Sequence, residues 1–170
     1  DVYKRQRGLG DVYKRQITLN LEDLKPNWEI IGLDISTVLV EGLMLREKDF
    51  RAFIADHDWS SYLGKQVYIH CSTAAIVPTW AYMLISAALS EISNSCLFGS
   101  RAALEKLLWL ELIKKLDYDS FIDQKVIVKG CSDEVIDESV YMLLATNLTP
   151  IVKSLMFGEP CSTVPIYKKR

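Results

Sequence analysis

Three cysteines, each followed by a serine, are the residues of this chain best suited to chemistry. They stand in the strings Cys71-Ser72-Thr73, Cys131-Ser132-Asp133 and Cys161-Ser162-Thr163. Each string follows a run of β-forming residues, so each cysteine is expected at the carboxyl end of a strand. In an open parallel sheet these ends share one edge, where ligands bind. The spacing therefore predicts that three distant thiols converge on one site.

Three converging thiols would suit a metal centre. Three thiolates and one further ligand can hold zinc or an iron–sulfur cluster. Asp133 and Glu159 are candidates for the fourth ligand, and an exchangeable position fits equally well. The chain has no Cys-x-x-Cys pair. The leading hypothesis is a metal- or iron–sulfur-binding accessory protein with Cys71, Cys131 and Cys161 as ligands.

Two other interpretations of the cysteines stay open. Helix amino termini near the strand ends favour thiolate, so one cysteine could be the nucleophile of a thiol enzyme. Buried, unreactive cysteine is also common, which fits a non-catalytic interaction module with structural cysteines. Cys96 opens a short strand at the opposite end and is assigned to the core. The sequence does not decide whether the protein is an enzyme.

The serines of the same strings are a second set of candidates. Ser72, Ser132 and Ser162 could cap helices, or could join loop amides in binding the anionic group of a cofactor at helix amino termini. No Gly-x-Gly-x-x-Gly or P-loop lysine motif accompanies them, which disfavours nucleotide binding. The chain also lacks a Gly-x-Ser-x-Gly elbow, which disfavours a serine hydrolase.

The elements that must position these residues alternate between strands and helices from about residue 66. Strands are predicted at 66–70, 96–98, 125–129 and 153–157, and helices at 78–92, 100–116 and 136–148. This β-α-β-α-β-α-β series predicts one α/β domain over residues 17–170. Its sheet should be mostly parallel, with helices on both faces. Strands at 17–21 and 29–33 and a short helix near Phe50 form an N-terminal strand-rich addition.

The first sixteen residues are set apart from this domain. The hexamer Asp1-Val2-Tyr3-Lys4-Arg5-Gln6 returns at residues 11–16 and then disappears. A repeat fold needs several stacked copies, and the hexamer looks like the translation of a sequencing adapter. We interpret residues 1–16 as an artefact, and the missing initiator methionine as a sign that the natural N-terminus is truncated.

Charge and hydropathy exclude several classes of partner. Without residues 1–16 the chain has fifteen basic and twenty acidic residues, a net charge of −5. This balance disfavours a nucleic-acid partner. The longest apolar stretch, residues 74–89, is interrupted by Pro78 and is too short to span a bilayer. Four dispersed cysteines indicate free thiols or ligands in a cytoplasmic protein, not a disulfide framework.

Several strings resemble one bacterial family of unknown function, numbered twenty-four-eighty. They are Phe50-Arg51, His57-Asp58-Trp59, residues 76–84, residues 128–133 and the distinctive Met156 to Pro165. The resemblance spans nearly all of the chain after residue 16. It supplies no catalytic residues, because the family has no established activity. Genes of this family often neighbour sulfur-mobilisation genes, so the resemblance implies iron–sulfur assembly proteins as partners, by association alone.

Overall fold

The computed structural model describes residues 16–130, 135–159 and 161–170, and its chain divides into two compact units. Residues Pro26–Leu108 form one of them, which we call the central unit. Residues up to Lys25 and Trp109–Arg170 form the other, the terminal unit. Among the described residues, each unit contains one sheet.

The central unit is built on a parallel three-stranded sheet in the order β2-β3-β4. In chain order its main elements are β2 (Ile30–Asp34), α1 (Glu47–Asp56), β3 (Gln66–His70), α2 (Thr79–Leu89) and β4 (Ser95–Phe98). Both crossovers step the same way across the sheet, so the right-handed rule places α1 and α2 on one face, where they contact each other. Buried side chains from the sheet and both helices, among them Phe50, Val67 and Ile85, form one core.

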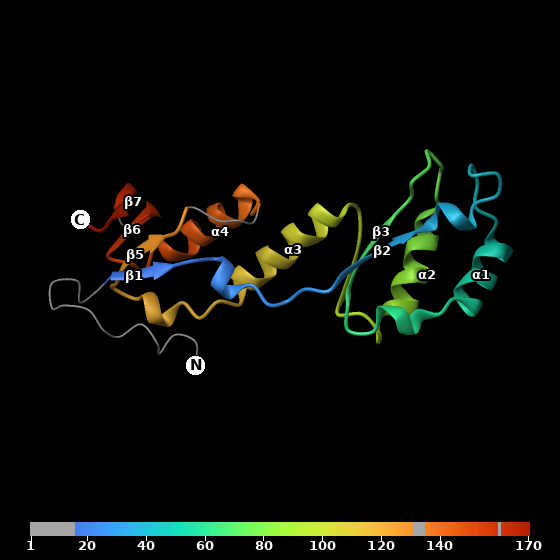
Figure 1. The fold of residues 1–170 in the computed structure, drawn as a ribbon, viewed down its shortest axis with the longest axis horizontal. Coiled ribbons are helices and arrows are strands. Elements are labelled where there is room, and N and C mark those ends of the chain that lie inside the picture. The colour runs from blue at the N-terminus through green and yellow to red at the C-terminus, as the bar shows by residue number, and fades with distance from the viewer. Residues whose placement is uncertain (1–15, 131–134, 160) are drawn as a thin grey trace. The chain divides into compact units, whose positions relative to one another are not determined.

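The terminal unit is built on a four-stranded sheet in the order β1-β5-β6-β7 (Figure 1). Its main elements are β1 (Gln16–Leu19), β5 (Lys125–Val128), α4 (Glu138–Leu148), β6 (Ser154–Glu159) and β7 (Ser162–Lys168). The first three strands in this order are parallel, and β7 pairs antiparallel with β6. In β5, Val126, Ile127 and Val128 are all buried, as expected for an inner parallel strand covered on both faces.

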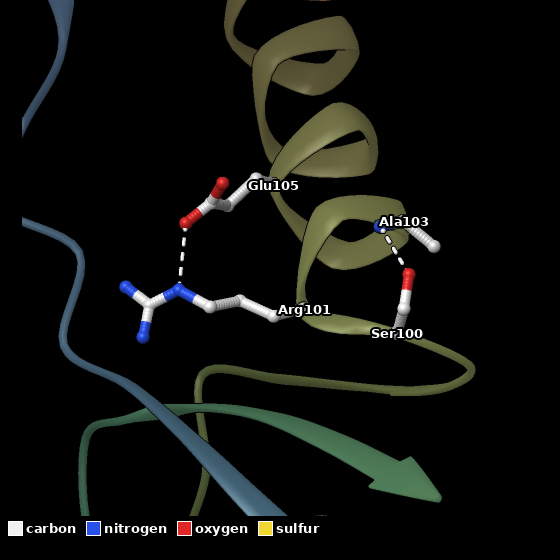
Figure 2. Close-up of polar contacts among 4 residues, drawn as sticks. All are labelled: Ser100, Arg101, Ala103 and Glu105. Atoms are coloured by element: carbon white, nitrogen blue, oxygen red, sulfur yellow. Dashed lines mark hydrogen bonds and ion pairs between the residues drawn. The ribbon is translucent and has the colours of Figure 1, made fainter. Parts of the chain in front are cut away.

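The helix α3 (Arg101–Lys114) crosses the boundary between the units at Leu108. Ser100 precedes it, and the Ser100 hydroxyl accepts a hydrogen bond from the Ala103 amide at 3.1 Å (Figure 2). Arg101 Nε lies 3.0 Å from Glu105 Oε1, one turn further on (Figure 2). Ser100 thus caps the start of α3, and its hydroxyl satisfies one of the amides that a helix start leaves open.

The predicted α/β class and the mostly parallel pairing are confirmed. The expected single series of strands is wrong in one respect, because the strands are distributed over two sheets. The strand β7 was not predicted, since Pro165 interrupts its β-forming pattern. Gln16, the last residue of the repeated hexamer, pairs with Lys125 in the terminal sheet. The rest of the residues interpreted as an artefact, 1–15, lie outside the described residues.

Candidate functional site

The first predicted thiol, Cys71, directly follows β3 in the central unit. Its Sγ lies 3.3 Å from the Thr73 carbonyl oxygen and 3.4 Å from Thr73 Oγ1. Burial raises the pKa of the nearby Tyr82 phenol, and negative charge on Cys71 would raise it further. Neither Thr73 group is a base that would generate a thiolate. The contacts of Cys71 thus fit a locally satisfied thiol better than a nucleophile.

Asp34 ties the carboxyl ends of β2 and β3 together. Its Oδ1 accepts hydrogen bonds from the Ser36 amide at 2.9 Å and the Ser72 amide at 3.1 Å. The Ser72 side chain and these amides hold the pKa of Asp34 well below its usual range. The Ser72 hydroxyl has one proton to share between Asp34 and Ser36 Oγ, which lies 2.8 Å away. The network fixes two loops at this edge of the central sheet.

Replacing Asp34 with asparagine should lower the free energy of unfolding at pH 7 by about 0.5–1 kcal/mol, the size of a lost cap at a half-buried site. The folded-state pKa lies below the unfolded value, so the carboxylate stabilises the fold above the unfolded pKa of about 3.9. That contribution is lost as the pH falls through the folded pKa. Urea denaturation from pH 8 to pH 3 should show a constant difference down to about pH 5, which then shrinks. A difference that persists unchanged at pH 3 would contradict the prediction.

The helix-capping prediction is wrong for Ser72 and Ser162. Ser72 belongs to the Asp34 network, and α2 begins only at Thr79 after Pro78. Ser162 is the first residue of the strand β7. Aspartates cap instead, because Asp34, Asp58 and Asp137 accept amide hydrogen bonds at helix starts. Of the other candidates, Cys131, Ser132 and Asp133 lie outside the described residues.

Cys161 lies in the hairpin between β6 and β7 of the terminal unit, where it is exposed. Gly158, in the same hairpin, has a φ of +124°. A Cβ at this position would lie 2.5 Å from the Ser162 carbonyl oxygen, so only glycine fits here. The neighbouring Glu159 has a buried Oε1 with no hydrogen-bond partner among the described residues. The hairpin thus combines a thiol with an unsatisfied carboxylate oxygen.

The expectation that all three thiols share one sheet edge is wrong. Cys71 follows a strand of the central sheet, whereas Cys161 follows a strand of the terminal sheet. Within the residues that the structure describes, no group of three histidine, cysteine, aspartate or glutamate side chains could hold a metal ion. Sequence periodicity locates strands but does not assign them to sheets, which is why a common edge was expected.

The terminal unit also contains an open apolar groove of about 390 Å³, which the sequence analysis missed. It lies between α4 and the strands β5, β6 and β7. Its lining residues are Val128, Glu138, Tyr141, Met142, Leu144, Ala145, Leu155, Met156, Phe157 and Ile166. Burial raises the pKa of Tyr141, and the charge of Glu22 adds to the effect.

A signal for this groove was present in the sequence of α4. Val140, Leu144 and Leu148 form the buried stripe that the periodicity predicted. Tyr141 and Met142 extend the apolar surface beyond that stripe, and Met142 is 70 % exposed. A helix that needs only one stripe to cover its sheet, yet has apolar residues beside it, indicates a second apolar contact.

Comparisons with known proteins identify a family and nothing more specific. None of the described helices is long and apolar enough to cross a membrane. No curated protein matches the chain, and no solved structure matches it. The family model described as "Protein of unknown function (DUF2480)" matches residues 12–169. This match confirms the resemblance seen in the sequence, and the chain belongs to that family.

Proposed function

We propose that this protein is a cytoplasmic, non-enzymatic binding module whose terminal-unit groove takes a small molecule with an apolar body and an amine at one end. The observation that carries the proposal is the groove itself, with its volume of about 390 Å³ and its apolar lining. Ligand sites typically have volumes of about 300–1,000 Å³, mostly apolar walls and few polar groups. Cys71, Cys96 and Cys161 are free thiols, which supports a reducing compartment.

The groove walls favour an apolar body of adaptable shape. The rings of Tyr141 and Phe157 stand perpendicular at a centroid distance of 5.6 Å and form one aromatic surface. Met142 and Met156 also line the groove, and their unbranched thioethers adjust to ligands of different outline. We therefore expect an alkyl or aromatic group, held by burial of apolar surface, to occupy most of this space.

Glu138 sets the expected polarity of the ligand. Among the described residues that line the groove it is the one charged residue, and it is the first residue of α4. The groove wall is almost wholly apolar and Glu138 is exposed, so its carboxylate faces solvent rather than the wall. It would attract an ammonium group at the solvent end of a bound ligand through a charge-assisted hydrogen bond and repel another carboxylate. The ligand class that fits best is an amine with an apolar chain or ring.

A fluorescent displacement assay tests this proposal. N-phenyl-1-naphthylamine should bind the full-length protein with increased emission, and octylamine, octan-1-ol and octanoate should compete in that order. Octylamine should bind about tenfold more tightly than octan-1-ol, and the Glu138→Gln variant should remove this preference. Equal competition by all three, unchanged in the variant, would contradict the assigned polarity. Failure of the dye and every competitor to bind would overturn the proposal.

A second pair of variants separates groove binding from general surface hydrophobicity. Ala145→Phe places a ring inside the groove and should weaken dye binding at least about tenfold, because it fills the apolar volume. Thr146→Phe adds the same ring at the next residue, which is exposed and outside the lining. Dye binding should survive in the Thr146 variant. Equal losses, or no loss, would place the bound dye elsewhere.

A metal or iron–sulfur site confined to the terminal unit is a second candidate function. The observation that favours it is the buried Glu159 Oε1 without a described partner, two residues before Cys161. Gly130 packs against the same hairpin, because a Cβ on Gly130 would lie 3.4 Å from Gly158 Cα. Cys131, the next residue in the sequence, lies outside the described residues and would under this proposal add a second thiolate for zinc or an iron–sulfur cluster.

Metal analysis of anaerobically purified protein tests this second candidate. Zinc or iron should be bound, and Cys161→Ser should remove it, whereas Cys71→Ser in the central unit should leave the metal content unchanged. Iron–sulfur assembly proteins would then be the expected partners. Metal-free, colourless protein would contradict this candidate without affecting the groove proposal.

A further inference from the structure

The two units of this chain are copies of one sequence pattern, 59 residues apart. The matching residues run from the segment before β3 to the end of β4 in one copy, and from the segment before β5 to the end of β6 in the other. Equivalent residues in the two copies include Asp58 and Asp117, Ser61 and Ser120, Val67 and Val126, Tyr82 and Tyr141, Met83 and Met142, Leu89 and Leu148, Phe98 and Phe157, and Gly99 and Gly158. With one residue added, Cys71-Ser72 also matches Cys131-Ser132. Two of the three Cys-Ser strings are therefore explained by the repeat.

Side-chain contacts follow the same correspondence. In the central unit, Trp59 Nε1 donates a hydrogen bond to the Ile54 carbonyl oxygen at 2.9 Å. In the terminal unit, the equivalent Tyr118 hydroxyl donates to the equivalent Ile113 carbonyl oxygen at 2.8 Å. An aromatic residue five positions after the helical carbonyl thus closes both motifs in the same way.

The backbone repeats as well. The Gly64 amide donates to the Ile92 carbonyl oxygen at 2.9 Å, and the equivalent Asp123 amide donates to the Ile151 carbonyl oxygen at 2.8 Å. Gly64 and Asp123 both have a positive φ, of +70° and +54° respectively. Each unit is therefore the same strand-helix-strand motif, in which β3, α2 and β4 correspond to β5, α4 and β6.

The copies differ at one sheet edge. In the terminal unit, the outer edge of β6 pairs with the antiparallel strand β7. In the central unit, the equivalent strand β4 is the edge of its sheet, and among the described residues no strand pairs with its outer side. The last strand of this motif can therefore accept an antiparallel neighbour on its outer side. Among the described residues this happens at β6, which pairs with β7, but not at β4.

The backbone of β4 is available for such pairing. The Gly99 amide donates to the Ile69 carbonyl oxygen of β3 at 2.9 Å. Backbone groups alternate in direction along a strand, so those of Cys96 and Phe98 point away from β3. Their equivalents in β6, Leu155 and Phe157, are paired with β7.

The sequence of β4 lacks the charged residues and prolines that protect a free sheet edge from pairing with another strand. Free edges are normally protected by charge or proline, and the outer strand β7 has both, in Lys168 and Pro165. The sequence of β4 is Ser-Cys-Leu-Phe, and α2 beside it contains no charged residue. Phe98 is 57 % exposed, and its ring lies 4.4 Å from that of Tyr82 in α2.

We propose that β4 pairs antiparallel with β4 of a second copy of this chain, which joins two central sheets across a two-fold axis. An uncharged strand can face its own copy without like-charge repulsion, and a two-fold contact is the commonest way in which identical chains associate. The added strand takes the position that β7 has on β6. The contact would also cover Phe98, whose equivalent Phe157 pairs with Val164 of β7 and is 36 % exposed.

The oligomeric state of the full chain tests this proposal. Light scattering after size exclusion should give a dimer, and Phe98→Lys should raise its dissociation constant at least about tenfold, because each copy then brings a charge into the paired edge. Leu63→Lys adds the same charge at a 69 % exposed residue of the same unit and should leave the dimer intact. A monomer at every concentration would overturn the proposal. A dimer unaffected by Phe98→Lys would also overturn it.

Amide hydrogen exchange identifies the strand without any substitution. The Cys96 and Phe98 amides should exchange slowly at high protein concentration and faster on dilution, because only the pairing with a second copy protects them. Protection that does not change with dilution would assign this edge to a contact within one chain and overturn the proposal. If Phe98→Lys does not fold, Cys96→Pro serves in its place, because it removes one outward amide as Pro165 does in β7.

Discussion

Replacing Phe121 with alanine should lower the free energy of unfolding of the terminal unit by about 3–5 kcal/mol. Phe121 is fully buried, and its ring lies 6.4 Å from that of Tyr118. It closes the short 3-10 turn (Asp119–Phe121) that leads into β5. Truncation would remove a large, fully buried apolar side chain and leave a cavity that the packed surroundings cannot fully close.

Trp109 provides the measurement, because it is 3 % exposed and is the one tryptophan of the terminal unit. Its fluorescence during urea denaturation, in a variant whose other tryptophans are phenylalanine, would report that unit alone. Val135→Ala removes apolar atoms at a fully exposed site of the same unit and should change stability by less than about 1 kcal/mol. Similar losses for both variants would contradict the core position of Phe121.

Replacing Gly158 with alanine should destabilise the β6–β7 hairpin by about 2–5 kcal/mol, from a strained φ together with overpacking. The residue has a φ of +124°, which side chains with a Cβ rarely adopt. The new Cβ would lie 2.5 Å from the Ser162 carbonyl oxygen, and a backbone atom cannot move aside as a flexible side chain can. Hydrogen exchange of the β7 amides should accelerate accordingly.

Gly99 provides a matched control, because it occupies the equivalent position of the central unit. Its φ is +149°, and a Cβ there would first meet Ala103 Cβ at an ordinary 3.5 Å. Gly99→Ala should therefore show the backbone strain without the collision, and should cost about 1–2 kcal/mol. The difference between the two variants measures how tightly β7 closes over β6. Equal effects would show that the Ser162 carbonyl moves freely.

Local structure could be predicted well from the sequence. The strand at Gln66–His70 lies where the pattern placed it, and the helix α3 falls within the predicted range 100–116. These features depend on interactions between residues close in sequence, such as hydrophobic periodicity and hydrogen bonds to the first helical turn. The missed strand β7 has Pro165 within it, and an edge strand tolerates proline because one side of its backbone needs no partner.

The candidate site could be predicted only in part. Cys71 and Cys161 do follow strands, as the sequence indicated, but the two strands belong to different sheets. A strand's pattern shows which face is buried and does not show which other strand lies beside it. The groove could not be predicted for the same reason. Its lining residues Tyr141, Phe157 and Ile166 come from α4, β6 and β7, which lie together only after the sheet forms.

The sequence by itself determined the family, the α/β class and the order of the helices and strands, because these follow from composition and short-range periodicity. It also contained the 59-residue repeat, whose meaning became clear only when the paired contacts of Ile54 and Ile113 appeared. Tertiary structure alone decided the division into two sheets, the apolar groove and the unequal edges of β4 and β6. The physical reason is that strand pairing and side-chain packing join residues far apart in the chain, and local sequence does not select those partners.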